Sequence, residues 1–107
     1  MPNYQEMDRA YQALGDRTRR AMVERLVQGP ASVSELAKDQ PMSLPAVMLH
    51  LKVLEESGLV KSRKQGRVRT CEVVPQMLSE AERWLSERRQ MWELSLDRLG
   101  KYLGVEK

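Results

Sequence analysis

The chain has 107 residues, with 18 Lys and Arg against 15 Asp and Glu, a formal net charge of +3 and 41% hydrophobic residues, enough for one domain with a modest core. No apolar run approaches the length of a membrane span, and the N-terminus, Met-Pro-Asn-Tyr-Gln-Glu, does not resemble a signal peptide, so we expect a cytoplasmic protein with no membrane contact. The single cysteine excludes an internal disulfide.

Helical spacing dominates the first forty residues. A first apolar stripe, with intervals of three and four residues, consists of Tyr4, Met7, Tyr11 and Leu14. It predicts an amphipathic helix that ends at Gly15. Asp16 can cap a second helix over about residues 17–28, and Ser32 or Ser34 can cap a short third helix.

A fourth helix is predicted from Ser43 to Ser57. Its inward positions recur with a period of 3.6 residues and are Val47, Leu51 and Leu54. Ser43 is a suitable N-cap, and Gly58 can adopt the left-handed conformation that ends a helix. The third and fourth helices therefore form a helix-turn-helix pair.

Two β-type runs follow directly, over residues 59–64 and 67–74. A two-residue link that contains glycine is typical of a hairpin, and Gln65-Gly66 provides it. The fold class expected is mainly α with a small β-hairpin: a winged helix-turn-helix with five helices and a two-stranded wing, in a single domain over residues 1–107.

The fifth helix is predicted to begin at Pro75 and to end at Gly104. A chain this short cannot easily cover the apolar stripes of both terminal helices, so we expect them to pack against a second copy in a two-fold homodimer. The residues expected at that interface are Tyr4, Met7, Tyr11, Leu78, Leu85, Trp92, Leu99 and Tyr102. The alternative is that the fifth helix folds back over its own core.

The hairpin carries the basic excess. Its five cations, with no acid among them, are Lys61, Arg63, Lys64, Arg67 and Arg69, while the rest of the chain holds 13 basic and 15 acidic residues. Such a protrusion suits a polyanion. With Gln65-Gly66 as the loop, Lys64 would face Arg67, and a phosphate between them would relieve their repulsion. The alternative is a solvated loop.

Two segments carry a family resemblance. Ala13 to Arg20 reads A-L-G-D-R-T-R-R, and His50 to Val60 reads H-L-K-V-L-E-E-S-G-L-V. From Ala10 to about Val74 the chain resembles the ArsR (ArsR/SmtB) family of bacterial winged-helix repressors. The resemblance implies a homodimer whose recognition helices enter successive major grooves of an inverted-repeat operator, with the wings on the flanking backbone. It also implies release of the DNA when a signal arrives.

Within this scheme the recognition helix would contact double-stranded DNA through Ser43, Leu44, Pro45, Met48, Leu49 and Lys52, and the wing through its five cations. Four of these helix residues are apolar and cannot form hydrogen bonds with bases. They can pack on thymine methyl groups, or they can form a surface for another protein. The alternative function is therefore a winged-helix protein-interaction module.

No chemistry beyond binding is indicated. Where many relatives place a Cys-x-Cys metal site, this chain has Ser32-Val33-Ser34, and the fifth helix has no His, so we expect neither metal nor any other cofactor. His50 and Cys71 are expected to be packed residues, and no nucleophile–base arrangement suggests an enzyme. A further alternative keeps DNA binding and adds an unknown small-molecule inducer that lodges between the terminal helices near Trp84 or Trp92.

Overall fold

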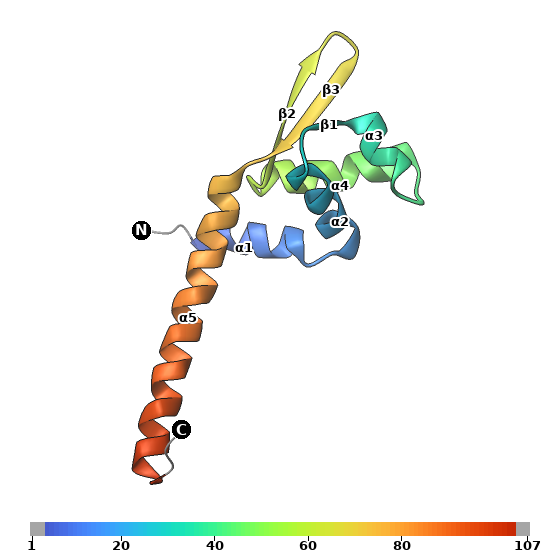
Figure 1. Cartoon of the computed structure of the whole chain (residues 1–107). Helices are drawn as coiled ribbons and strands as arrows, with labels where there is room; N and C mark the ends of the chain where they lie inside the picture. The colour runs from blue at the N-terminus through green and yellow to red at the C-terminus, as the bar shows by residue number, and fades with distance from the viewer. Residues whose placement is uncertain (1–3, 105–107) are drawn as a thin grey trace.

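The computed structural model describes residues 4–104, and for Tyr4 the backbone only. Within this range the elements are α1 (Tyr4–Leu14), α2 (Arg17–Val27), β1 (Ala31–Ser32), α3 (Val33–Lys38), α4 (Leu44–Glu56), β2 (Val60–Gln65), β3 (Val68–Val73) and α5 (Pro75–Tyr102) (Figure 1). The winged helix-turn-helix prediction, with five helices, is confirmed. None of these helices is long and apolar enough to cross a membrane.

The sheet has three strands in the order β1-β3-β2, so the prediction of a two-stranded wing is wrong by one strand. Ala31 lies opposite Cys71, and Ser32 lies opposite Thr70, both in antiparallel pairing. A strand of two residues has no alternating pattern that a sequence could reveal. Its pairing attaches the base of the wing to the start of α3.

The hairpin turn lies one residue later than predicted. Gln65 pairs with Val68, so the two loop residues are Gly66 and Arg67, and Lys64 faces Arg69 rather than Arg67. Gly66 has a φ of 61°, while φ at Arg67 is not positive. A positive φ at the first central position is what a type II′ turn requires, and glycine meets that requirement without strain.

Side-chain caps begin three of the helices as predicted. The backbone N–H of Arg19 donates to Asp16 Oδ2 at 3.0 Å, and that of Ala46 donates to Ser43 Oγ at 3.3 Å. Of the two candidates for α3, Ser32 is the cap, and it forms a reciprocal capping box with Glu35. These caps fix where α2, α3 and α4 begin.

One apolar core joins the helices to the sheet. The largest of its fully buried side chains are Met22, Leu26, Leu36, Val47, Leu51, Leu54, Leu59 and Cys71. Val47, Leu51 and Leu54 are the predicted inward residues of α4, so the core itself sets which face of α4 points away from the domain. Gly58, with a φ of 82°, then turns the chain from α4 into β2.

Helix α5 leaves the domain after its first turns. Near its start it packs on α1, where Tyr11 Oη donates to the carbonyl of Ala81 at 2.9 Å. Beyond that contact it extends away from the body, opposite to the hairpin, and the molecule measures 66 × 31 × 21 Å (Figure 1). The alternative in which the fifth helix folds back over its own core is therefore wrong.

Candidate nucleic-acid interface

Helix α4 carries large apolar residues on its outward face as well as on its inward face. The inward residues are at most 1% exposed, whereas Leu44 is 52%, Met48 36% and Leu49 68% exposed. Pro45 and Lys52 are exposed beside them. The structure thus gathers the six predicted DNA contacts of the recognition helix on or next to one outward surface, from the N-cap at Ser43 to Lys52.

The N-terminus of α4 lies at this surface, since Ser43 and Leu44 are both exposed. Free backbone N–H groups and the helix dipole make such an end favourable for an anion. Farther along the helix, Lys52 is highly exposed, and its Nζ lies 4.0 Å from Glu56 Oε1. An exposed ion pair at that distance contributes little, so Lys52 is free to move to another anion.

A polar cluster at the opposite edge of α4 ties it to the first two helices. The Arg19 guanidinium donates to the carbonyl of Ala13 at 2.7 Å and to that of Gln12 at 3.1 Å, and it lies 3.3 Å from His50 Nδ1. His50 Nδ1 is also 3.9 Å from Asp16 Oδ2. Arg19 therefore caps α1 and contacts α4 at once, a role that the sequence analysis missed.

Asp16 is part of the same cluster, and its pKa is lowered there. The backbone N–H of Arg19, with smaller contributions from the charges of Arg19 and His50, lowers the pKa of the Asp16 carboxyl. Arg20 donates to the carbonyl of Leu14 at 2.8 Å, so a second arginine caps the end of α1. The segment from Asp16 to Arg20 thus joins α1 to α2, and its Arg19 and Arg20 are hydrogen-bonded within the chain.

The wing places its cations on two faces. Ser62 Oγ donates to Glu55 Oε1 at 2.6 Å, so this face of the hairpin is turned toward α4. Lys64 follows Ser62 by two residues, and Arg69 lies directly opposite Lys64. Because side chains alternate along a strand, Lys64 and Arg69 project from the same face as Ser62. We call this the inner face of the wing.

The inner face meets α4 across a hollow of about 480 Å³. Arg69 lines it from the wing, and Pro45, Met48, Leu49 and Lys52 line it from the recognition helix. The structure therefore brings predicted contacts from both elements to a single concave surface.

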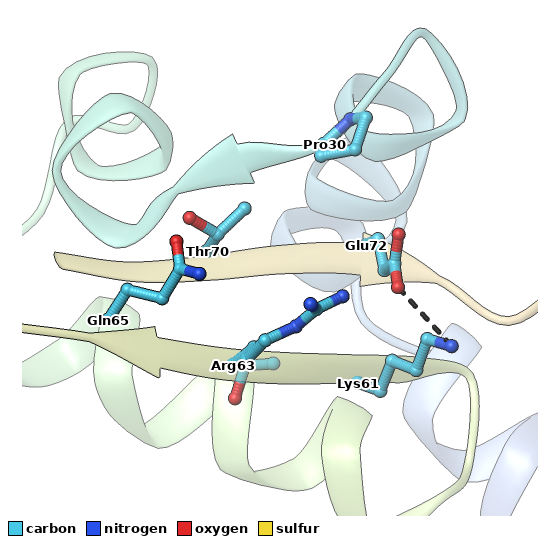
Figure 2. Close-up of a pocket in the computed structure, with 7 residues that line it drawn as sticks. Pro30, Lys61, Arg63, Gln65, Thr70 and Glu72 are labelled. Carbon is cyan, nitrogen blue, oxygen red and sulfur yellow. Dashed lines mark ion pairs between the residues drawn. The ribbon is translucent and has the colours of Figure 1, made fainter.

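Lys61 and Arg63 project from the other side of the hairpin, with Gln65, Thr70 and Glu72 (Figure 2). Lys61 Nζ lies 3.3 Å from Glu72 Oε1. Arg67 is exposed in the turn. The five wing cations are thus divided: two on the inner face, two on the outer face and one at the tip.

The predicted dimer residues are also divided by the structure. Met7 is 3% exposed and packs inside the chain, while Tyr11 and Leu78 are half-buried. Leu85, Trp92, Leu99 and Tyr102 are between 52% and 88% exposed on α5. The side chain of Tyr4 lies outside the described residues.

Trp84 sits at the junction of α1 and α5. Its ring centroid is 5.9 Å from that of Tyr11, and the Arg88 guanidinium carbon lies 4.7 Å from the Trp84 centroid. Among the described residues its Nε1 is a buried side-chain donor that has no hydrogen-bond partner. Trp84 and Tyr11 line a hollow of about 240 Å³ together with Met7, Asp8 and Leu85.

The single cysteine, Cys71, is buried in the core. Burial, and to a smaller degree the charge of Glu55, raise the pKa of the Cys71 thiol to about 11. A buried thiol of such high pKa is a poor nucleophile at neutral pH. In residues 4–104 no three His, Cys, Asp or Glu side chains lie close enough together to hold a metal ion.

The chain is similar to known helix-turn-helix proteins. A family model described as a helix-turn-helix domain matches residues 14–63, from the end of α1 into β2. The HTH-type transcriptional regulator Rv2034 of Mycobacterium tuberculosis is 53% identical over 75 residues, which cover 70% of each protein. The alignment therefore covers more than two thirds of both proteins.

Two solved structures share the fold over almost their whole length. The ArsR family transcriptional regulator RHA00566 superposes with a TM-score of 0.81 at 46% identity, covering 86% of this chain and 95% of its own. An ArsR-like transcriptional regulator from Rhodococcus sp. RHA1 also has a TM-score of 0.81, at 30% identity, covering 92% of this chain and 93% of its own. Both matches extend beyond the helix-turn-helix segment.

Proposed function

This chain belongs to the ArsR family of winged helix-turn-helix transcriptional regulators, and we propose that it is a homodimeric repressor that binds an inverted-repeat operator in double-stranded DNA. As a member of that family it is a DNA-binding transcriptional regulator and not an enzyme. The whole chain serves as one winged domain with dimerising terminal helices, and it acts in the cytoplasm, where bacterial DNA lies.

The observation that carries the proposal is the concave surface shared by α4 and the inner face of the wing. An α-helix fits the major groove, and the wing beside it is at the right place for the adjacent phosphates. The proposed phosphate contacts are Lys52, Lys64, Arg67 and Arg69, together with the N-terminus of α4 at Ser43. Each cation that meets a phosphate releases counterions and adds to affinity without regard to sequence.

Lys61 and Arg63 have a secondary role in this proposal. They lie on the outer face, and Lys61 is already paired with Glu72. They add to the positive field of the wing and draw DNA toward it, while direct contact falls mainly to the inner face and the tip.

The proposed dimer rests on an apolar stripe of α5 that is half-buried at Leu78 and exposed from Leu85 onward. Leu78, Leu85, Trp92 and Leu99 are spaced by seven residues, the repeat of helices that pack along each other. An apolar stripe of this length is a typical oligomer contact. Two-fold pairing would give two recognition helices, which matches a palindromic site.

A titration with duplexes taken from upstream of the protein's own gene tests the function. Binding measured by fluorescence anisotropy at two salt concentrations should be specific and should weaken steeply with salt. Arg69→Ala should lower the slope of log K against log salt by about one for each wing that contacts DNA, for all sequences alike. Lys101→Ala, which removes the same charge from the far end of α5, is the control.

Binding that is independent of salt, or an Arg69→Ala effect confined to sequence preference, would count against this function. Because the proposal includes no metal, treatment with a chelator of divalent cations should leave the affinity unchanged. A chelator that abolishes or strengthens binding would contradict that part.

The hollow beside Trp84 supports a second element of the proposal, an apolar inducer. Its lining is mainly apolar, which suits an apolar ligand. A ligand here would contact both helices of the proposed dimer interface. Tryptophan fluorescence against a panel of small apolar molecules tests this, with Trp84→Phe to identify the tryptophan that responds.

A further inference from the structure

We infer that the outward face of α4 recognises the C5-methyl groups of thymine in the major groove, with Leu49 as the central contact. The inference rests on the proposed DNA binding and adds the means of sequence recognition. The site would favour thymine at defined positions of each half-site through apolar contact rather than through hydrogen bonds to base edges.

The first observation is the geometry of the face. Pro45, Met48, Leu49 and Lys52 occupy positions i, i+3, i+4 and i+7 of a helix, so they share one surface. Leu49 is 68% exposed, the highest value among the large apolar residues of α4. The helix that would enter the groove therefore presents hydrocarbon at its centre.

The second observation concerns hydrogen bonding. Of the side chains on this face, Lys52 has a donor that is free to turn toward a base. Ser43 Oγ accepts the N–H of Ala46 at the cap, so its hydroxyl keeps one donor. Glu55 accepts from Ser62 through Oε1, and the exposed Glu56 is only loosely paired with Lys52. Pro45, Met48 and Leu49, at the centre of the face, have no side-chain donor or acceptor, so hydrogen bonds to bases can come only from its borders.

The third observation, the positive charge around the apolar face, favours DNA over a protein as the partner of this surface. The apolar face is bordered by Lys52 and, across the shared hollow, by Arg69, with Lys64 on the same face of the wing. An apolar protein partner would have to remove the water from these cations without supplying opposite charge, which is costly. Duplex DNA offers phosphates for the cations and thymine methyl groups for the hydrocarbon in one surface.

The expected size of the effect follows from burial of a methyl group. Taking one thymine methyl out of water against Leu49 should strengthen binding about fourfold. A dimer that makes this contact in both half-sites should therefore lose more than tenfold when both methyl groups are absent.

The experiment begins with selection of bound duplexes from a random library by the full-length protein. The selected duplex is then made with deoxyuridine in place of thymidine, first at single positions and then at all, and its affinity is measured at one fixed salt concentration. Deoxyuridine keeps the base pairing and removes the methyl group. We expect about a fourfold loss at each contacted thymine.

Two variants assign the effect to the helix. Leu49→Asn should bind the thymidine and deoxyuridine duplexes equally, because the apolar partner of the methyl group is gone. Val27→Asn replaces an apolar residue of similar exposure, 61%, at the end of α2 and should keep the full difference. The wild-type comparison needs no variant, so the test does not depend on the folding of Leu49→Asn.

Equal affinity of wild type for both duplexes, or a selected site that lacks thymine, would overturn the inference. So would a thymidine preference that persists in Leu49→Asn, since the methyl group would then act through DNA shape. An unchanged DNA affinity of Leu49→Asn would assign the apolar face to a protein instead. In each of these cases salt-steep DNA binding would survive, so the failure is distinct from failure of the proposed function.

Discussion

The winged body buries its apolar residues, whereas the distal part of α5 leaves its apolar residues exposed. In the body, the apolar stripes of α2, α3 and α4 close on one another and on the sheet, and their main side chains are almost completely buried. In α5 beyond Arg88, Met91, Trp92, Leu94 and Leu99 are all more than half exposed. The two regions have similar helical patterns and differ in whether this chain alone provides a partner.

This difference in burial indicates which part of the fold is stable in one chain and which part would need a second chain. The body has its own core and can hold the recognition helix and wing in place. Within residues 4–104 the large apolar side chains of the distal part of α5 are exposed and not buried in a core, and a long helix gains most of its stability from packing. It follows that the body determines the contact surface, and that in the proposed dimer the second copy would determine how two such surfaces are spaced.

The largest expected effect is on the body's core. Leu54→Ala removes a fully buried side chain and should cost about 2–5 kcal/mol of unfolding free energy, because the cavity cannot close completely. Leu99→Ala, measured in solution dilute enough for single chains, should cost less than about 0.5 kcal/mol. Urea denaturation followed by circular dichroism measures both, and equal costs would remove the distinction between the regions.

The second effect is on association. Trp92→Glu combined with Leu99→Glu places unpaired carboxylates in the proposed helix contact and should leave single chains. Light scattering coupled to size exclusion measures the mass. The circular dichroism of the body should persist, and DNA affinity should fall because each chain then holds one half-site. A double variant that remains dimeric would place the interface elsewhere.

The third effect, again within the body, concerns the cap of α3. Ser32→Ala removes the side-chain half of a capping box and should cost about 1 kcal/mol. Ser34, two residues later and exposed, makes no cap, so Ser34→Ala is the matched control with an expected change below about 0.5 kcal/mol. Thermal denaturation of the two variants compares them, and equal losses would contradict the assigned cap.

The smallest effect is the acid sensitivity of the body. The N–H of Arg19 lowers the pKa of Asp16, and the N–H of Ser32 lowers that of Glu35. Groups with a depressed pKa stabilise the fold above their unfolded-state pKa, and this contribution is lost as the pH falls through the folded-state value. Asp16→Asn should therefore make the unfolding free energy fall less steeply as the pH is lowered, in urea denaturation followed at several acidic pH values. An unchanged dependence on pH would show that Asp16 does not contribute.

Local signals in the sequence were enough for most of the fold. Asp16, Ser43 and Gly58 act where the pattern placed them, because caps and glycine turns depend on neighbouring residues. The hairpin was predicted but its turn was shifted by one residue. Its strands carry charged residues on both faces, so no inside-outside alternation fixed the register.

What sequence could not supply depended on distant contacts. The role of Arg19 joins residues of α1 and α4 that are up to 31 positions from it. The shifted register moved Arg67 from a strand position opposite Lys64 into the turn, and the contact of Ser62 with Glu55 decides which face of the wing lies toward α4. The candidate contacts were therefore predictable as residue types, and their arrangement on one concave surface required the three-dimensional structure.

Sedimentation of the full-length protein with a selected, fluorescently labelled duplex at two salt concentrations tests the central claim most directly. The account predicts two chains on each duplex, bound at low salt and largely released at high salt. One chain per duplex, or a complex that is indifferent to salt, would contradict it.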